Sequence, residues 1–557
     1  MAPPSELVLG IDLGTTNSAC AIVREGRASV VRRGEDRIVP SVVAALPDGS
    51  IVVGNRAKRR RSVDPTQVVY SSKRLIGRRW GSPEVQRMCS TVPYEIREGN
   101  NESVVVELGS RLHSIVEISA YVLTYLREMA EEALGQRVSK AVVAVPANFT
   151  DSQRSATRIA ARLAGLDVIR VINEPTAAAL AYGYIEDTDR RIAVYDFGGG
   201  TFDVTILQIT RNVFEVLATS GEMFLGGDDI DEAILGHMID TFRQRQGGEL
   251  ADSPVATERL RAVAEQIKIQ LSEQERAAVH LEEVLPGRGG TLEFSLSDLD
   301  LRRRIETIVR RTVPVCEDAL RTAGLASHQI DEIVLVGGTT RLPLVREVVQ
   351  QVFGKPPQTS INPMSVVAVG AAIQGAALMG SLVPMAASGA NPAGPSAAAS
   401  AVLLDVTPRS LGVRTVGGYV DFIIERNSPI PVEQTRLFTT TRDNQRFVRI
   451  QVCQGEEEEF EHNLKLGEVT LSGLRDAARG EVTIAVTFEI NTDGLLEVRA
   501  RDRDTGMQQV ATMRVLGGPS DTEVAQMAER LEPTPAPDRE PNRGPNRERG
   551  SVASRGR

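Results

Sequence analysis

The stretch Arg191-Ile-Ala-Val-Tyr-Asp-Phe-Gly-Gly-Gly-Thr-Phe-Asp-Val-Thr-Ile-Leu207 decides the fold of this chain. Two apolar, β-branched runs flank three glycines, which predicts a β-hairpin with a glycine tip. Glycines let backbone amides approach a ligand closely. The tip also carries Thr201, Asp196 and Asp203, and hydroxyl and carboxylate groups suit a phosphate chain with a divalent cation. An ordinary glycine-rich hairpin remains the alternative for this motif alone.

The same device occurs near the start of the chain. Leu7-Val-Leu-Gly-Ile-Asp-Leu-Gly-Thr-Thr-Asn-Ser-Ala-Cys-Ala-Ile-Val23 again joins two apolar runs through an acid, a glycine and hydroxyl residues. Asp12 occupies the position of Asp196 in this copy. The duplication predicts two related lobes, each presenting a hairpin tip to one polyphosphate between them.

Composition excludes several classes of protein. The chain has 557 residues, is 41% hydrophobic and 25% charged, and has a net charge of −9. This balance is typical of a globular protein of several domains and does not favour nucleic-acid binding. Four separated cysteines indicate a reducing compartment, and five isolated histidines are interpreted as structural or surface residues and not as metal ligands. No leader or membrane-length apolar run is present, so we expect a cytoplasmic protein without a membrane partner.

Strands and helices alternate up to about Gly380, which predicts an α/β fold. A strand over 140–145 ends at Pro146, and another over 168–172 runs directly into Asn173-Glu-Pro-Thr. Glu174 would therefore lie at the carboxyl end of a strand. There it would orient a hydrated cation, or it would only complement the helix dipole.

Further candidate residues have two interpretations each. The basic stretch around Lys73 is either a solvated face or a source of one lysine that reaches a phosphate or the attacking water. Gly226 and Gly227 precede a helix, whose N-terminus favours anions. Helical spacing puts Glu265, Lys268 and Ser272 close to one face, which is solvated in most helices.

The C-terminal part has a different character. Residues 385–401 are rich in Ala, Ser, Gly and Pro, which predicts a flexible linker that closes with Val402-Leu-Leu-Asp-Val406. From Ser410 to Leu516 short alternating runs predict an antiparallel β domain, with a hairpin turn at Asp493-Gly494. A short helix over 522–530 and a disordered Pro- and Arg-rich tail would follow.

The phosphate device is not one of the common loops. Gly-x-x-x-x-Gly-Lys-Ser/Thr is absent, and no Gly-x-Gly-x-x-Gly follows the first strand. Asp12, Glu174 and Asp196 are candidates to hold magnesium, largely through water. Phosphoryl transfer depends on positioning and charge neutralisation, so spacing alone leaves a kinase and an ATPase equally open.

Five motifs, in order, resemble the signatures of the heat shock protein 70 (bacterial DnaK-type) chaperone family, a branch of the actin and sugar-kinase superfamily. They are Ile11-Asp-Leu-Gly-Thr-Thr-Asn-Ser18, Lys73-Arg-Leu-Ile-Gly-Arg78, Asn173-Glu-Pro-Thr-Ala-Ala-Ala-Leu-Ala-Tyr-Gly183, Asp196-Phe-Gly-Gly-Gly-Thr-Phe-Asp203 and Val334-Leu-Val-Gly-Gly-Thr-Thr-Arg341. The resemblance spans roughly Leu7 to Leu516.

The resemblance implies a two-lobed, actin-like α/β ATPase domain over 1–384, a linker over 385–408 and an all-β, antiparallel sandwich that binds peptides over 409–518. A short helical stub and tail would occupy 519–557. The resemblance implies that ATP or ADP binds together with Mg²⁺, and it leaves a role for K⁺ open. The partners that it implies are unfolded or extended peptides, a J-domain co-chaperone and a nucleotide exchange factor. The implied function is an ATP-dependent chaperone of the stress response.

The resemblance also assigns roles to residues. Lys73 would orient the hydrolytic water, with Asp12, Glu174 and Asp196 as the magnesium shell and Thr201 and Asp203 on the γ-phosphate side. The implied nucleotide contacts are Gly14, Thr15, Thr16, Asn17, Gly198, Gly199, Gly200, Gly226, Gly227, Asp228, Glu265, Lys268, Ser272, Gly337, Gly338, Thr339 and Arg341. The implied coupling residues are Pro146, Arg154, Arg170, Asn173, Thr176, Leu403, Leu404 and Asp405. The implied peptide contacts are Val413, Phe438, Val448 and Ile450, with Val416 and Thr441 as an arch over the peptide.

The chain departs from the family in several places. The helical lid is expected to be missing, which predicts fast peptide exchange, and the linker carries an insertion. Met364 and Ser365 replace the usual Asp-Glu, and Asp228 replaces a common Glu. Three arginines near the predicted peptide groove either favour peptides with acidic flanks or form a solvated face; they are Arg442, Arg446 and Arg449. The C-terminal tail has no acidic ending. Two rival functions remain open: a small-molecule kinase, against which the β domain speaks, and a regulatory scaffold with a dedicated client and little ATP turnover.

Overall fold

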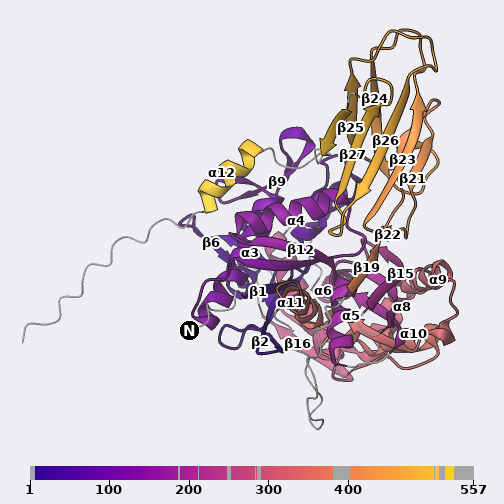
Figure 1. Ribbon diagram of the computed structural model, residues 1–557. Coiled ribbons are helices and arrows are strands. Elements are labelled where there is room, and N and C mark those ends of the chain that lie inside the picture. The colour runs from indigo at the N-terminus through magenta and orange to yellow at the C-terminus, as the bar shows by residue number, and fades with distance from the viewer. Residues whose placement is uncertain are drawn as a thin grey trace, which may run out of the picture.

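The computed structural model describes residues 7–185, 189–210, 213–246, 253–282, 284, 290–359, 361–380, 402–506, 508–512 and 521–531. Figure 1 shows two α/β lobes and a β sandwich that stands on them. The expected linker insertion over 385–401 and the expected tail after residue 531 lie outside the described residues. Within those residues, no helix has the length and apolarity that a membrane crossing requires.

Lobe I is built on the first of the two predicted hairpins. Its sheet has the order β12-β11-β1-β2-β3, with β1 parallel to β11 and antiparallel to β2. The strands are β1 (Val8–Asp12), β2 (Asn17–Arg24), β3 (Arg27–Val30), β11 (Lys140–Val145) and β12 (Asp167–Asn173). Apolar residues fill β1 and β11, as expected of parallel strands covered on both faces.

Two helices of lobe I have clear boundary signals. Helix α3 (Ile115–Leu134) begins where the Ser114 hydroxyl accepts the Glu117 amide, and it ends at Gly135 in the left-handed conformation. Helix α4 (Asp151–Leu163) begins at Thr150 in a capping box. Thr150 is therefore the cap of this helix.

Lobe II repeats this plan. Strand β13 (Arg190–Phe197) is parallel to β18 (Glu332–Val336) and antiparallel to β14 (Phe202–Thr210), which pairs with β15 (Val213–Glu222). The Gly-Gly-Gly hairpin forms as predicted, and Asp196 lies directly opposite Asp203 in its register. Asp196 is the last residue but one of β13, and Asp12 is the last residue of β1.

Helices α5 (Glu174–Ile185) and α11 (Val366–Leu378) pack against each other between the two sheets. Their contact is close because a Cβ at Gly370 would lie 1.7 Å from the carbonyl oxygen of Ala177. Only glycine permits this distance, so Gly370 fixes how the two lobes meet at their base.

The other elements extend the lobes. In lobe I they are β4 (Val39–Pro40), β5 (Val43–Ala45), β6 (Ile51–Val53), α1 (Asn55–Arg60), β7 (Val68–Val69), η2 (Ser72–Arg74), α2 (Pro83–Thr91), β8 (Ile96–Glu98), β9 (Val104–Leu108) and β10 (Arg111–Ser114), with η1 (Pro65–Gln67) and η3 (Asn100–Glu102). In lobe II they are α6 (Gly227–Gln246), α7 (Pro254–Leu271), β16 (Arg276–Leu281), β17 (Leu292–Ser297), α8 (Asp298–Arg310), α9 (Thr312–Thr322), η4 (Ser327–Gln329), η5 (Gly338–Arg341) and α10 (Pro343–Phe353).

The C-terminal β sandwich, defined here as β20–β28, consists of two antiparallel sheets with the orders β21-β20-β24-β25 and β23-β26-β27-β28. The strands are β20 (Leu411–Arg414), β21 (Val420–Ile424), β22 (Pro429–Ile430), β23 (Val432–Thr439), β24 (Phe447–Gln454), β25 (Leu464–Ser472), β26 (Thr483–Ile490), β27 (Leu496–Asp502) and β28 (Gln508–Thr512), with η6 (Phe460–His462). Alternating side chains of both sheets, among them Val452, Val486, Phe488 and Val498, form one core. The predicted fold class, a mixed α/β region followed by antiparallel β-sheets, is confirmed.

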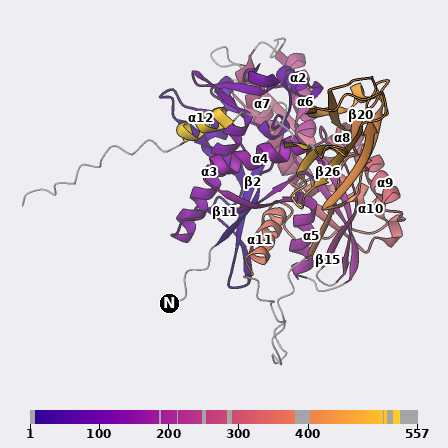
Figure 2. The same ribbon diagram turned by 45° about the horizontal axis from the view of Figure 1, so that its top comes forward.

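Two segments connect these parts. Strand β19 (Val402–Val406) joins the lobe II sheet beside β15 and also pairs with β22. Helix α12 (Asp521–Leu531), where the sequence predicted a helix over 522–530, lies against lobe I beside α3 and α4 (Figures 1 and 2).

Candidate functional site

The two hairpin tips face one central cavity of about 80 Å³. It lies where the ends of β1 and β13 meet the loop after β18. The cavity brings together most of the predicted phosphate and metal residues: Asp12, Gly14, Thr15, Thr16, Asn17, Lys73, Glu174, Asp196, Gly198, Gly199, Thr201, Gly337 and Gly338, and also Met364. Residues distant in sequence therefore converge as the duplicated hairpins predicted.

Lys73 is the cation of this cavity. Its side chain is buried in the short helix η2, and its Nζ donates a hydrogen bond to Glu174 Oε1 at 2.5 Å. The interpretation of this lysine as part of a solvated face is therefore wrong. The turn before it is held tightly, because Ser71 adopts a left-handed φ of 53° and its hydroxyl donates to Asp228 Oδ2 at 3.3 Å. Such a conformation in a non-glycine residue costs of order 1 kcal/mol and is typical of functional sites.

Three carboxylates and one lysine line the cavity, so its negative charge exceeds its positive charge. Burial, and then the neighbouring Glu174, raise the pKa of Asp12 to about 7, although Lys73 opposes the shift. Burial and the nearby carboxylates raise the pKa of Asp196 well above its usual range. A bound divalent cation would relieve this repulsion, so the residues fit the predicted Mg²⁺.

The fit is to a cation held through water. Among the residues that the structure describes, no three acidic, histidine or cysteine side chains come close enough together to ligate one ion directly. Asp12, Glu174 and Asp196 nevertheless line the same cavity. Magnesium keeps most of its water, which agrees with carboxylates arranged around it at a distance.

Asp203 lies beside the cavity and outside its lining. It is buried, and its Oδ1 accepts a hydrogen bond from Asn148 Nδ2 at 2.5 Å. Burial, followed by Glu174, raises the pKa of Asp203 to about 7, whereas the bond from Asn148 lowers it. Asn148 was missed as a site residue, because it lies outside the motifs from which the phosphate site was predicted.

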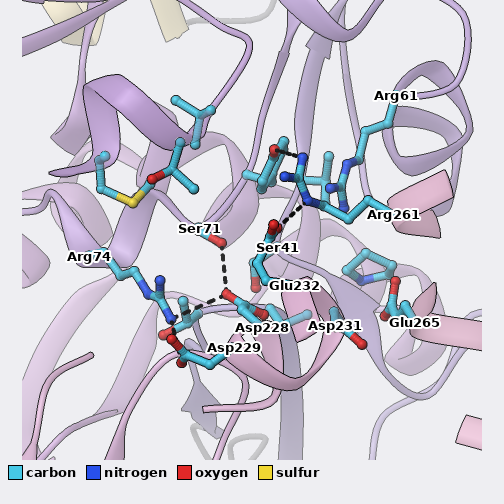
Figure 3. A pocket seen from close by; sticks show the side chains of 18 of the residues that line it. Ser41, Arg61, Ser71, Arg74, Asp228, Asp229, Asp231, Glu232, Arg261 and Glu265 are labelled. Carbon is cyan, nitrogen blue, oxygen red and sulfur yellow. Dashed lines mark hydrogen bonds and ion pairs between the residues drawn. The ribbon is translucent and has the colours of Figure 1, made fainter. Parts of the chain in front are cut away.

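Four further nucleotide candidates line two neighbouring cavities. Glu265 and Asp228 line a cavity of about 110 Å³ between the lobes, shown in Figure 3. Ser272 and Arg341 line another, of about 380 Å³, which shares Pro363 with the central cavity. Glu265 and Ser272, which were predicted to lie close to one helix face, thus line different cavities.

Lys268 and the glycine loops support the central cavity. Lys268 Nζ donates to the carbonyl oxygen of Gly227 at 3.1 Å and to Asp231 Oδ2 at 2.7 Å. Thr339 Oγ1 donates to the Gly198 carbonyl at 2.8 Å. A Cβ at Gly226 would lie 2.2 Å from the Gly199 carbonyl oxygen, so glycine is required where the two loops cross. Gly200 lies at the same loop, and its carbonyl accepts Arg74 Nη2.

Charged pairs join the lobes across the mouth of the cleft. Lys58 of α1 pairs with Glu265 of α7 at 2.7 Å, and Arg61 pairs with Glu258 at 2.8 Å. Glu258 is 1% exposed and also accepts the Tyr70 hydroxyl at 3.0 Å. We call Lys58, Arg61, Glu258 and Glu265 the clamp. Long-range pairs of this kind leave no local pattern, and sequence reasoning identified only Glu265.

A second network joins α4 and the junction of β12 and α5 to the linker strand β19. Arg154 is buried and donates to the carbonyl of Ala147 at 3.2 Å and to Asn173 Oδ1 at 2.6 Å. Asn173 Nδ2 and Thr176 Oγ1 both donate to Asp405 Oδ2, at 2.7 and 3.3 Å. The structure therefore brings together four predicted coupling residues.

The other coupling candidates lie around this network. Leu403 pairs with Phe214 in the lobe II sheet and packs on its core, whereas Leu404 is partly exposed. The carbonyl of Pro146 accepts the Phe149 amide at 3.1 Å, in the turn before α4. Arg170 Nη2 donates to the carbonyl of Thr492 in the β sandwich at 3.4 Å.

The β sandwich contacts both lobes through residues that the sequence did not single out. Asp493 was predicted only as a turn residue, and its Oδ2 accepts Arg158 Nη1 of lobe I at 2.6 Å. Asp151 Oδ1 accepts the Leu496 amide at 2.8 Å. On lobe II, Arg426 donates to Asp318 Oδ2 at 2.8 Å. We call these contacts the docking interface.

The predicted peptide residues lie on both sheets of the sandwich: Val413, Val448 and Ile450 on the first, and Phe438 on β23 of the second. Val413 and Ile450 are buried, and Phe438 and Val448 are half-buried against the same core. The predicted arch residues differ from them, since Val416 is 81% exposed and Thr441 is also exposed.

Two of the three arginines near this sheet have acidic neighbours. Arg446 pairs with Asp476 at 3.1 Å, and Arg449 lies 3.7 Å from Glu468. These pairs weaken the hypothesis that the arginines select peptides with acidic flanks, because two of the charges are already balanced within the sandwich.

A comparison with models of protein families agrees with this arrangement. The family model described as Hsp70 protein matches residues 8–549. The match covers both lobes, the linker strand and the β sandwich.

Proposed function

The chain belongs to the Hsp70 family, whose members are ATPases and ATP-dependent chaperones of unfolded peptides, and from that premise we propose how its own residues perform each step. The central cavity binds the phosphates of ATP between the two hairpin tips. Glycine-rich loops offer backbone amides to phosphate oxygens, and Thr15, Thr16 and Thr201 add hydroxyl groups. The adenosine would extend toward the cavity lined by Ser272 and Arg341.

Lys73 is proposed as the residue that positions the attacking water. The observation that carries this proposal is the buried Lys73–Glu174 pair, which faces the cavity. Burial and the ion pair hold the ammonium group in one place, and orientation supplies most of the catalysis in phosphoryl transfer. Bound Mg²⁺ would neutralise phosphate charge, and Asp12, Glu174 and Asp196 would hold its water. K⁺ as a further ion stays a prediction.

Coupling is proposed to run through Asp405. Its carboxylate accepts hydrogen bonds from Asn173 and Thr176, which lie at the end of β12 and the start of α5, next to Glu174. A change in the cavity therefore acts on elements that also hold the linker strand. Peptides would bind extended on the sandwich, over Val413, Val448 and Ile450 of the first sheet and Phe438 of the second, with Val416 and Thr441 above them.

J-domain and nucleotide-exchange partners also remain proposals. Arg170 would contribute to the J-domain surface, and it already contacts the docked sandwich at Thr492. A partner at this surface would therefore compete with docking. Cytoplasmic location is supported by four cysteines that are free of disulfides.

ATP turnover with and without an extended apolar peptide tests the proposal. We expect Lys73→Met to bind ATP but to hydrolyse it at least about 100-fold more slowly. Lys355→Met, whose ammonium group bonds backbone carbonyls of lobe II, is the matched control and should turn over normally. Wild-type turnover as slow as that of Lys73→Met would instead favour a regulatory scaffold. Asp405→Ala with unchanged peptide stimulation would contradict the coupling proposal.

A further inference from the structure

Helix α12 is held on lobe I by a small contact. Val524 and Met527 are buried on its inner face, and the Ser114 hydroxyl donates to Met527 Sδ at 3.4 Å. Asn100 Nδ2 donates to Glu523 Oε1 at 2.9 Å. This apolar face is short, so a polar contact has a large share in holding the helix.

Glu117 of α3 is the unusual residue beneath α12. Its side chain is 0% exposed, and neither carboxylate oxygen accepts a hydrogen bond within the described residues. Glu117 occupies the helix position from which a capping-box glutamate bonds back to the cap residue, yet its oxygens do not do so. Burying a carboxylate without such partners is costly unless a positive charge lies close by.

Two basic side chains approach this carboxylate. His113 Nδ1 lies 3.0 Å from Glu117 Oε1, and His113 is itself buried. Arg530 Nη1, from the last turn of α12, lies 3.6 Å from Glu117 Oε2. Arg530 is the only one of the two whose position depends on where α12 lies.

A cavity of about 590 Å³ surrounds the contact. Glu117, Arg530 and Met527 line it, together with residues of β9, β10 and the turn at Gly77. A space of this size holds many water molecules. The helix therefore rests on a few apolar side chains and on charge, with little close packing between them.

We propose that Glu117 is a receptor in lobe I that recognises the basic end of α12, and that Arg530 is the group it recognises. Docked α12 supplies the charge that the buried carboxylate needs, and the carboxylate in return holds α12 in place. When α12 leaves lobe I, Glu117 loses this partner, and His113 stays beside it.

A thiol pair across the contact measures docking. Asn100→Cys and Glu523→Cys replace two side chains that already touch, and Cys89→Ser removes the exposed native cysteine. Burial raises the pKa of Cys20 and Cys453 to about 12 and that of Cys316 further, so these thiols oxidise slowly. The disulfide fraction in a glutathione redox buffer then gives the effective concentration of the two thiols.

We expect Arg530→Gln to lower this effective concentration about fivefold, which is the effect expected from the loss of a partly exposed ion pair with one buried partner. Arg530→Lys should restore part of the loss. Glu529→Gln, an exposed neighbour on the same helix, should change nothing. In a Glu117→Gln background, Arg530→Gln should cause no further loss.

The proposal is overturned if Arg530→Gln leaves the effective concentration unchanged, if Glu529→Gln lowers it equally, or if the Arg530→Gln loss persists in the Glu117→Gln background. The Arg530 variants alter only a surface side chain, so their result is interpretable even if Glu117→Gln impairs folding. The measurement needs neither ATP turnover nor peptide, and it therefore stands apart from the proposed function.

Discussion

Asp493→Asn should release the β sandwich from the lobes. The Asp493 side chain is 12% exposed at the turn between β26 and β27, and it reaches into lobe I. Oδ2 accepts Arg158 Nη1 at 2.6 Å, and Oδ1 accepts the Val171 amide at 3.3 Å while Arg170 Nε lies 3.9 Å away. Asparagine keeps the size and one acceptor, but it removes the charge that two arginines face.

The size of the effect follows from the exposure of the pair. A hydrogen bond to a charged group contributes about 1.5–3 kcal/mol. The Arg158 side chain is 38% exposed, so solvent screening places the loss near the lower end. A loss of about 1.5 kcal/mol shifts the ratio of docked to undocked protein roughly tenfold.

Trp80 provides the assay. It is the single tryptophan of the chain, and its neighbour Arg79 donates to the Lys465 carbonyl of the sandwich at 2.7 Å. Undocking should shift the Trp80 emission, and X-ray scattering should record a larger radius of gyration.

The control for this experiment is Asp504→Asn, the same chemical change in a residue that pairs with Arg475 inside the sandwich. It should leave both signals unchanged. The reasoning is refuted if Asp493→Asn leaves the scattering curve unaltered, or if its effect adds fully to that of Arg158→Gln, since paired residues should not be additive.

Three further predictions concern the clamp, the pH dependence of docking and the base of the lobes. Glu258→Gln should speed release of a fluorescent ADP analogue about tenfold in stopped flow, because it removes the negative charge that pairs with Arg61 across the lobes. Glu306→Gln, the same change at an exposed residue of α8, should leave the release rate unchanged. Burial raises the pKa of Asp151 from 3.8 to about 6 against its bond from the Leu496 amide, so the docked state binds this proton more tightly than an undocked state in which Asp151 is exposed. Docking of the sandwich should therefore weaken as pH rises toward and through about 6. Asp151→Asn should remove this pH dependence from the Trp80 signal. A wild-type signal that does not change with pH would contradict the prediction. Gly370→Ala should destabilise the lobes by about 3 kcal/mol in urea unfolding, because its Cβ meets the Ala177 carbonyl; an unchanged midpoint would show that the helices can separate at no cost.

The central cavity was predictable because its residues lie in local motifs. An acid at a strand end, followed by glycine and threonine, determines its own hairpin, and two such hairpins imply a shared ligand. Asp12, Asp196 and Thr201 could therefore be identified before any fold was known. The buried state of Lys73 was not local information, since it depends on Glu174 in another strand–helix unit.

The docking interface and the α12 contact could not be predicted in this way. Asp493 and Arg158 meet only because an entire sandwich sits on lobe I, and a turn residue has the same sequence signal whether or not it has a partner. Glu117 resembles an ordinary capping glutamate at the start of an amphipathic helix. Its special position appears only when burial is known, because burial changes the energy of a charge without changing the pattern around it.

The docked sandwich and the clamp both depend on the relative orientation of the two lobes. Asp493 holds the sandwich to lobe I, and Arg426 holds it to Asp318 of lobe II, so docking requires one relative orientation of the two lobes. The clamp at Lys58 and Glu265 also joins the lobes, on the nucleotide side. A ligand that favours one lobe orientation must therefore change the affinity of the sandwich for the lobes, and docking must change the affinity for that ligand by the same factor. This reciprocity arises from rigid contacts at two places on the same pair of lobes, and it does not require a continuous chain of residues between them.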